Sequence, residues 1–329
     1  MKILIVAPAW VGDMVMAHCL VVLLNQRHPG ARVDMVAPHA TAPLAFRMPG
    51  VTNCWTLESG HGQLNLGERR SLGRRLAAER YDEAIVLPNS FKSALVPFWA
   101  RIPKRTGWRG ESRLVVLNDR RRLDQARYPL MVERFMALGL APGADLPRPY
   151  PQPRLEADPV RASVLVAELG LDAADVTALC PGAEYGPAKR WPPRYYAEVA
   201  RHEVTAGRQV WLLGSPGDAG ACAEIANLVQ EGVVNLAGRT SLLDALDLLS
   251  LAGRVVCNDS GLMHLACAAG VPVVAVYGST SPDFTPPLSE DARVIRHPVP
   301  CSPCFRRECP LGHLDCLEKL TPEQVIAAL

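Results

Sequence analysis

Short apolar runs alternate with helical patterns along this chain, and that alternation limits the folds it can adopt. In the first part, the runs KILIVAP, VDMVAP and EAIVLP are followed by helical patterns over 14–27, 41–48 and about 90–100. Strand, helix, strand in that order predicts parallel strands joined by right-handed crossovers. A doubly wound α/β domain is therefore expected at the start of the chain.

A proline-rich segment separates this part from a second one. Residues 140–159 hold six prolines and few apolar side chains, as a linker does. The runs VTALCPG, QVWLLG, GVVNLAG, RVVCND and VPVVAVYG follow, and the helical patterns between them cover about 194–206, 218–230, 241–251 and 260–269. We expect two Rossmann-like domains, 1–158 and 159–329, with ligands in a cleft between the carboxyl ends of both sets of strands.

The composition agrees with two compact domains and argues against a membrane-spanning or secreted protein. The 329 residues, 49% of them apolar, are more than one core usually organises. No segment reaches the roughly 18 uninterrupted apolar residues of a membrane-spanning helix. The start, MKILIVAP, has a lysine before an apolar run, but the run breaks at Pro8 and no small-x-small cleavage site follows. We interpret it as the first strand of a cytoplasmic protein.

Charge is divided unevenly between the two halves. Residues 1–158 carry 22 Lys and Arg against 14 Asp and Glu, whereas residues 159–329 carry 13 against 19. The basic half indicates an anionic partner or surface, although solvated arginines on helix faces explain the same count. We do not expect nucleic acid to be that partner.

The stretch RVVCNDSGLMHLACAAGVPVVAVYGSTSP, residues 254–282, gathers polar residues where a strand ends. After Asp259, Ser260 can cap a helix, and Gly261 leaves its first N–H groups open to a phosphate. His264 lies one turn further on the same helix face and can reach the same anion. A capped helix with a core histidine explains each residue singly, but the combination predicts a ligand site.

A second polar loop, CPGAEYGPAKRWPPRYY, again lies between a strand and a helix. Gly182 and Glu184 belong to its flexible part. A diphosphate leaving group needs a cation to take up its developing charge, and Lys189 is the candidate. The alternative is that Lys189 and Arg190 are solvated charges before a helix that starts with proline.

A third strand-end loop, LLGSPGD, contains Gly214 and Asp218. Asp218 can accept hydrogen bonds from ribose hydroxyls, as an acid after a Rossmann strand does. No GxGxxG follows the first strand of either half, which argues against a dinucleotide-dependent oxidoreductase.

The stretch APAWVGDMVMAH places Asp13 after Gly12, at the tip of the first strand. If the second half holds a nucleotide diphosphate, this acid faces it and can take a proton from an incoming hydroxyl. The start of the helix keeps Asp13 ionised. Asp13 as the N-cap of helix 14–27 is the simpler interpretation, and it is compatible with the catalytic one.

Four of the ten cysteines are clustered in CSPCFRRECPLGHLDC, at Cys301, Cys304, Cys309 and Cys316. C-x2-C followed by two more cysteines resembles a structural zinc loop, but the spacings of the last two are irregular for a zinc ribbon. Bound metal, reduced packing thiols and a disulfide therefore remain open. The others lie in apolar segments, as buried reduced thiols do: Cys19, Cys54, Cys180, Cys222, Cys257 and Cys267.

Taken together, these motifs resemble the ADP-heptose:lipopolysaccharide heptosyltransferases of glycosyltransferase family 9. The likeness runs end to end through WVGDMVMA, PGAEYGPAKRWP, NDSGLMHLA and the tail PCSPCFRRECPLGHLDCL, which is typical of the enzymes that add the second heptose. The resemblance implies a GT-B fold with two Rossmann-like domains facing across a cleft. The donor, ADP-L-glycero-β-D-manno-heptose, would bind the C-terminal half and the lipid acceptor the N-terminal half.

The resemblance also implies an activity and its residues. Heptose would be transferred with inversion to heptosyl-Kdo2-lipid A through an α1→3 bond, without cofactor or catalytic metal, by an enzyme peripherally associated with the cytoplasmic face of the inner membrane. Asp13 corresponds to the general base and Lys189 to the diphosphate-binding lysine. The donor-site turn corresponds to Asp259, Ser260, Gly261 and His264. The acceptor side would meet Kdo carboxylates and lipid phosphates. Its candidate residues are Gly12, Asp13, Arg69, Arg70, Arg74, Arg75 and Arg120 to Arg122.

Three other interpretations share parts of this pattern. A nucleotide-sugar epimerase has the same architecture and a diphosphate site but takes no lipid acceptor. A non-catalytic nucleotide-binding module gives Asp13 no role. A related heptosyltransferase acting at another step of the core is the nearest alternative.

Overall fold

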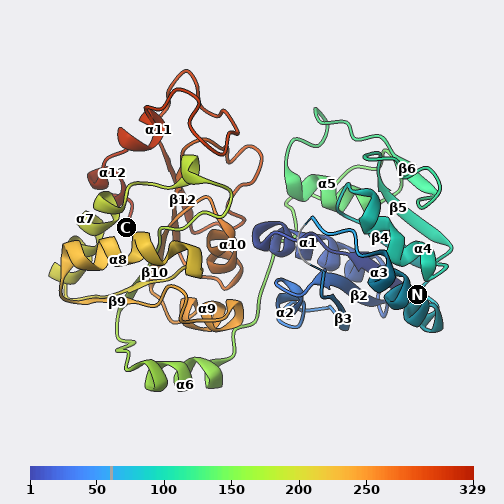
Figure 1. Cartoon of the computed structure of the whole chain (residues 1–329), viewed down its shortest axis with the longest axis horizontal. Helices are drawn as coiled ribbons and strands as arrows, with labels where there is room; N and C mark the ends of the chain where they lie inside the picture. The colour runs from blue at the N-terminus through green and yellow to red at the C-terminus, as the bar shows by residue number, and fades with distance from the viewer. Residues whose placement is uncertain (60–61) are drawn as a thin grey trace. The chain divides into compact units, whose positions relative to one another are not determined.

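The computed structural model describes residues 1–59 and 62–329. The chain divides into two compact units, Met1–Leu155 and Glu156–Leu329. Among the described residues, each unit is built on one parallel six-stranded sheet (Figure 1). The expected α/β class with two Rossmann-like sheets is confirmed.

The sheet of the first unit consists of β1 (Lys2–Val6), β2 (Arg32–Pro38), β3 (Asn53–Leu57), β4 (Glu83–Val86), β5 (Lys104–Trp108) and β6 (Asp119–Arg121). Their order across the sheet is β3-β2-β1-β4-β5-β6. β1 lies near the centre of this order. Its side chains are buried from Ile3 to Val6, as expected of a strand covered on both faces. The direction of winding reverses between β1 and β4, and ligands bind outside the carboxyl ends of the strands at such a point.

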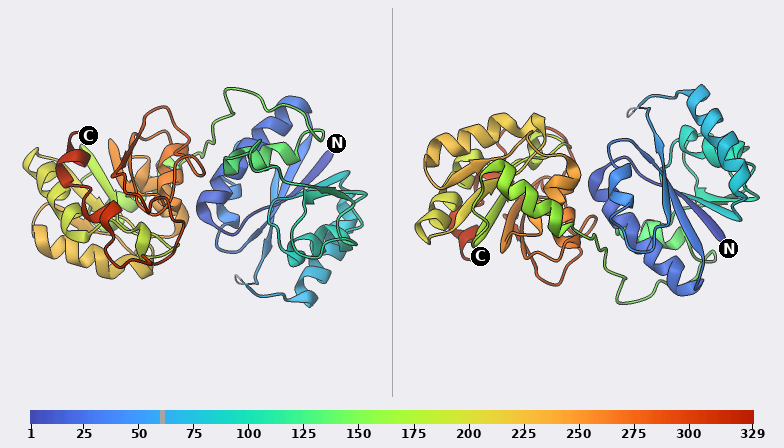
Figure 2. Two further views of the ribbon diagram at one scale, coloured as in Figure 1. Left: turned by 90° about the horizontal axis from the view of Figure 1, so that it is seen from above. Right: turned by 90° about the horizontal axis from the view of Figure 1, so that it is seen from below.

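Helices cover both faces of this sheet. They are α1 (Val11–Arg27), α2 (Ala42–Ala45), α3 (Leu66–Leu76), α4 (Leu95–Trp99) and α5 (Met131–Leu138), with the single turns η1 (Ala77–Glu79) and η2 (Phe91–Ala94). α1 packs with α5 on one face, and α3 packs with α4 on the other (Figure 2). Leu72 and Val96 pack against Leu4 of the sheet, so the second face is closed by apolar contacts.

α1 begins earlier than the sequence pattern predicts. Trp10 is its N-cap, and the backbone N–H of Met14 donates to the Trp10 carbonyl at 2.8 Å. The pattern omitted this first turn because Gly12, a poor helix former, interrupts it. Asp13 is therefore the third residue of the helix and not its N-cap. A carboxylate in the first turn still meets the partial positive charge at the start of a helix.

The second unit repeats the architecture with β7 (Val176–Cys180), β8 (Gln209–Leu212), β9 (Val233–Asn235), β10 (Arg254–Asn258), β11 (Val273–Tyr277) and β12 (Ala292–Arg296). Their order is β12-β11-β10-β7-β8-β9. The winding reverses between β7 and β10, both buried along almost their whole length. This point defines the edge at which a ligand is expected in the second unit.

The helices of the second unit are α6 (Pro159–Leu169), α7 (Pro193–Thr205), α8 (Ala219–Val229), α9 (Leu242–Leu249), α10 (Gly261–Ala268), α11 (Asp315–Glu318) and α12 (Pro322–Ile326), with the turns η3 (Pro187–Lys189) and η4 (Pro216–Asp218). α7, α8 and α12 lie on one face of the sheet, and α6, α9 and α10 on the other (Figure 2). Trp191 is buried with Leu317 and Leu320 in the core, and its indole N–H donates to the Leu320 carbonyl at 2.9 Å. The C-terminal segment is thus part of this core.

Several elements were not expected from the sequence: β3, β5, β6 and β12, and helices α3, α5 and α6. β3, β6 and β12 lie at sheet edges, where one side of a strand is open and its sequence need not be apolar. α6 starts at the end of the proline-rich segment, where the Asp158 side chain accepts hydrogen bonds from Val160 and Arg161 at 3.0 Å each. The sequence pattern identified the buried centre of each sheet better than its edges.

Candidate functional site

Lys189 is fixed at the carboxyl edge of the second sheet. Its ammonium donates to the Asp259 carboxylate at 2.7 Å and to the Asp259 carbonyl at 3.1 Å. Thr280 donates its hydroxyl to the same carboxylate at 2.6 Å, and Asp259 is only 3% exposed. The Lys189 ammonium also lies over the Tyr185 ring, 5.1 Å from its centroid. Lys189 is therefore a positioned cation, whereas Arg190 is exposed.

Asn258, which sequence reasoning missed, holds the loop that carries Lys189. Its side-chain amide donates to the Pro181 carbonyl at 2.6 Å. Its oxygen accepts hydrogen bonds from the Trp191 N–H and the Tyr196 hydroxyl, both at 3.1 Å. Both ends of the loop are thus bonded to the end of β10, while Glu184 between them is exposed. The only sequence signal for this role was an amide directly before Asp259 at a strand end.

Unpaired polar atoms lie at the start of α10. Ser260 is at the N-cap position, but its side chain makes no capping hydrogen bond, which corrects the expected cap. In the part of the chain that the structure describes, Ser260 Oγ and His264 Nδ1 are among the buried polar atoms that have no partner. Buried polar atoms are nearly always paired in folded proteins. Together with the open helix start at Gly261, these atoms indicate a place for a polar ligand.

His264 carries no charge at neutral pH. Burial lowers its pKa to about 4, and the nearby Asp259 only partly offsets that effect. The side chain is 3% exposed. His264 can therefore offer a hydrogen bond to an anion near α10, but it does not offer a positive charge.

The burial of His264 predicts a pH dependence of stability. Its pKa is below the unfolded value of 6.5, so the unfolded chain takes up a proton first, and stability falls as pH drops from about 6.5 towards 4. Between pH 7 and pH 5 the loss is about 2 kcal/mol of unfolding free energy. Urea unfolding at the two pH values measures it, and His264→Gln should remove this component. The exposed His202→Gln is the matched control, and an unchanged slope in His264→Gln would contradict the assignment.

Asp218 is engaged in its own loop. Its carboxylate accepts hydrogen bonds from the Ser215 backbone N–H at 3.0 Å and the Ser215 hydroxyl at 2.7 Å, which closes the η4 turn. A Cβ atom at Gly182 would lie 2.3 Å from this carboxylate, and one at Gly214 would lie 2.9 Å from the Asp218 Cβ. The two glycines therefore let Asp218 approach the loops after β7 and β8. This local role explains all three residues, and the ribose contact of Asp218 stays a prediction.

The first unit has a pocket of about 710 Å³ that is lined by Asp13. Its wall is formed by residues 6–10, at the end of β1 and just after it, and by residues 87–93, which follow β4. Side chains that include Ser59 and Arg69 complete the wall. This volume lies within the range of about 300–1,000 Å³ that is usual for small-molecule sites. The structure thus places Asp13 at the carboxyl edge of the first sheet, in a pocket at the point where the winding reverses.

The arginines expected on the acceptor side lie in different environments. Arg69 lines the pocket, and its side chain donates to the carbonyls of Leu64 at 2.8 Å and Lys92 at 3.4 Å. Burial lowers the pKa of Arg69. The exposed ones, none of which lines the pocket, are Arg70, Arg74, Arg75, Arg120 and Arg122.

Two further arginines hold the backbone in place. Arg121 is buried, and it donates to Asp119 at 2.8 Å and to the carbonyls of Ala137 at 2.8 Å and Leu140 at 2.6 Å. Arg113, which was not predicted, donates to the Pro88 carbonyl at 2.8 Å and so supports the pocket wall. Neither Arg121 nor Arg113 is available to an acceptor in this arrangement.

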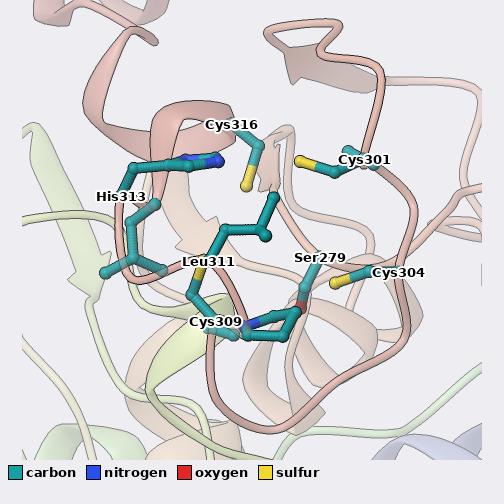
Figure 3. Close-up of a pocket in the computed structure, with 11 residues that line it drawn as sticks. Ser279, Cys301, Cys304, Cys309, Leu311, His313 and Cys316 are labelled. Carbon is teal, nitrogen blue, oxygen red and sulfur yellow. The ribbon is translucent and has the colours of Figure 1, made fainter.

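The clustered cysteines Cys301, Cys304, Cys309 and Cys316 line a small pocket in the second unit (Figure 3). All four are free thiols. Within residues 1–59 and 62–329, no group of three or more His, Cys, Asp or Glu side chains is placed so that it could hold a metal ion. The other six cysteines are buried, as expected.

Comparison with known proteins gives a consistent result. Residues 69–315 match Glycosyltransferase family 9 (heptosyltransferase). Lipopolysaccharide heptosyltransferase 2 of Salmonella typhimurium is 46% identical over an alignment that covers all of this chain and 97% of the relative. The solved structure of E. coli ADP-heptose lps heptosyltransferase II is 45% identical, with a TM-score of 0.89, and covers 100% and 97% of the two chains. E. coli heptosyltransferase WaaC, solved with ADP, shares the fold at 22% identity, with a TM-score of 0.75 over 99% and 98% of the chains.

Proposed function

The chain belongs to glycosyltransferase family 9, the heptosyltransferases, and we propose that it adds the second heptose of the lipopolysaccharide inner core. It is a glycosyltransferase, and its curated relatives at 46% identity are named lipopolysaccharide heptosyltransferase 2. The proposed reaction moves L-glycero-D-manno-heptose from ADP-heptose to heptosyl-Kdo2-lipid A through an α1→3 bond. An epimerase of the same architecture is not favoured, because these relatives cover the full chain.

The donor half of the proposal is supported most directly by the edge of the second sheet. There a positioned ammonium, an open helix start and unpaired buried hydroxyl and imidazole atoms occur together. We propose that the diphosphate of ADP-heptose binds at Lys189 and the first N–H groups of α10. The interactions of Lys189 and of these N–H groups with the diphosphate would strengthen as the leaving ADP takes up negative charge. They would therefore stabilise the transition state in which ADP departs.

On the acceptor side, we propose that Asp13 is the general base. In the proposed inverting step, the acceptor hydroxyl oxygen forms a bond to the anomeric carbon while the bond from that carbon to the diphosphate breaks. The hydroxyl proton goes to the Asp13 carboxylate, and ADP leaves with its charge balanced by Lys189. The pocket around Asp13 has room for a sugar, and Arg69 in its wall suits an anionic acceptor.

We further propose that the enzyme works at the cytoplasmic face of the inner membrane, where the lipid acceptor lies. Throughout residues 1–59 and 62–329, none of the helices combines the length and the apolar character that crossing a bilayer requires. Attachment would therefore be peripheral in the proposal. The exposed arginines of the first unit are candidates for contacts with lipid phosphates, and we assign that role to no single one of them.

Mass spectrometry of the acceptor tests the function. The full chain is incubated with ADP-heptose and heptosyl-Kdo2-lipid A, and the acceptor is expected to gain the mass of one heptose while ADP is released. Kdo2-lipid A without heptose is the matched acceptor control and should remain unchanged. An altered nucleotide sugar without lipid product would support an epimerase, and reaction only with the heptose-free acceptor would assign the chain to another core step.

A further inference from the structure

The stretch between β12 and α11 lies against the loop that carries Lys189. Residues 297–314 form neither helix nor strand (Figure 1). The Ala188 N–H donates to the Arg307 carbonyl at 3.0 Å, and a Cβ atom at Gly186 would lie 2.5 Å from that carbonyl. Gly186 therefore permits an approach that places Arg307 beside the residue before Lys189.

The Tyr185 side chain connects the loop to this stretch. Its hydroxyl donates to the Phe305 carbonyl at 2.7 Å. The Phe305 N–H in turn donates to the Ser279 carbonyl at 2.7 Å, shortly after β11. The next residue, Thr280, donates its hydroxyl to the Asp259 carboxylate. The Tyr185 ring is thus held by contacts that lead back to the edge of the second sheet.

Two cations contact the Tyr185 ring. The Lys189 ammonium lies 5.1 Å from the ring centroid, and the guanidinium carbon of Arg307 lies 5.4 Å from it. Both distances are within the roughly 6 Å over which the face of an aromatic ring attracts a cation. The ring therefore keeps near each other two positive charges that would otherwise repel.

The Lys189 ammonium alone does not give this edge a net positive charge. The Asp259 carboxylate, 2.7 Å away, balances it. His264 is uncharged at neutral pH, because burial lowers its pKa. A diphosphate is an anion of more than one charge, and its negative charge grows further as it leaves the sugar. The proposed donor therefore needs a second cation at this edge.

Arg307 is placed to supply that cation. Arg190, beside Lys189, faces the Asp218 carboxylate at 3.8 Å. Arg307, by contrast, is exposed, and its guanidinium lies against a ring rather than a carboxylate. A guanidinium stacks through its face and donates hydrogen bonds from its edge, so it can keep a ring contact while it binds two phosphate oxygens.

We propose that Arg307 binds the diphosphate of ADP-heptose together with Lys189, and that Tyr185 is the positioning residue that holds the two cations for it. The inference deepens the proposed function and rests on it, because it adds a binding group for the same donor. Arg307 would contact the phosphate oxygens, whereas Tyr185 would act only through Lys189 and Arg307.

Calorimetric titration of the full chain with ADP and with AMP is the primary test. Arg307→Ala is expected to weaken ADP binding by roughly tenfold or more, the usual effect of losing a charge-assisted hydrogen bond. AMP, which has one phosphate, should lose less affinity than ADP. Arg307→Lys keeps the charge without the planar fork and should recover part of the loss. Arg306→Ala removes the adjacent exposed arginine and is the matched control, with ADP affinity unchanged.

Two substitutions of Tyr185 test its positioning role. Tyr185→Phe keeps the ring and should keep most of the ADP affinity, whereas Tyr185→Leu removes the ring and should weaken ADP binding. In the double variant Tyr185→Leu/Arg307→Ala the loss should be smaller than the product of the two single losses, because both changes affect one contact. Multiplicative losses, or equal effects of Phe and Leu, would contradict the role of the ring.

The outcomes separate this inference from the proposed function. ADP affinity in Arg307→Ala equal to that in Arg306→Ala would overturn the role of Arg307. Equal losses for ADP and AMP, together with a lower unfolding temperature, would also overturn it, because they show a structural effect. A wild-type chain that neither binds ADP nor transfers heptose would instead refute the proposed function.

Discussion

Replacement of Asp13 by asparagine is expected to lower kcat for heptose transfer by roughly 10²–10⁴-fold, the usual contribution of a general base. Asparagine keeps the size of the side chain and removes its ability to take a proton. Since Asp13 lines the pocket of the first unit, and the proposed diphosphate site lies in the second, ADP binding should be unchanged. The measurements are ADP release during turnover and calorimetric titration with ADP.

A carboxylate at the other edge of the sheet provides the control for Asp13. Glu79, just before β4, pairs with Lys2 at 3.6 Å and lies at the amino edge of the sheet. Glu79→Gln should leave turnover unchanged. If Asp13→Asn loses ADP affinity with little change in kcat, Asp13 is not the base and contributes to nucleotide binding instead.

Replacement of Lys189 by alanine is expected to lower kcat/KM for ADP-heptose by roughly 10²–10³-fold and to weaken ADP binding as well. In the proposal, Lys189 meets the diphosphate both in the bound donor and in the transition state, so binding and turnover fall together. Initial rates over a range of donor concentrations and ADP titration measure the two effects. Arg201→Ala removes an exposed cation from α7 of the same unit and should leave both unchanged.

A double variant that also changes Asp259, the buried partner of Lys189, distinguishes a role of Lys189 in binding from a role in stability. Lys189→Ala leaves the Asp259 carboxylate, only 3% exposed, without its ammonium, which is itself destabilising. In the double variant Lys189→Ala/Asp259→Asn that charge is gone, so unfolding stability should largely recover while activity stays low. Recovery of activity along with stability would show that Lys189 is structural.

The sequence predicted the centre of the fold better than its edges for a physical reason. β1, β4, β7 and β10 are buried on both faces, so their apolar runs were recognisable. Edge strands such as β6, with the sequence DRR, carry no such pattern, because pairing with one neighbour decides their conformation. Helix patterns were recognisable where one face is buried, but their first turns depend on capping residues.

The candidate site could be predicted in part because its residues are grouped at strand ends. Asp259, Ser260 and His264 follow one strand, and Lys189 lies in a loop between a strand and a helix. The role of Asn258 could not be predicted, since it depends on contacts with Pro181 and Trp191, far away in the sequence. The neutral state of His264 was missed for the same reason, because tertiary burial, together with the nearby Lys189 charge, lowers its pKa.

The pair between Lys189 and Asp259 has a consequence for selectivity. The Lys189 ammonium already has an anionic partner, so a diphosphate that binds there, as we propose, must compete with a resident carboxylate. A small monovalent anion gains little from that exchange, whereas a diphosphate can share the ammonium and reach the helix start with its remaining oxygens. In this proposal the Asp259 carboxylate makes binding of small monovalent anions at Lys189 less favourable than binding of a diphosphate.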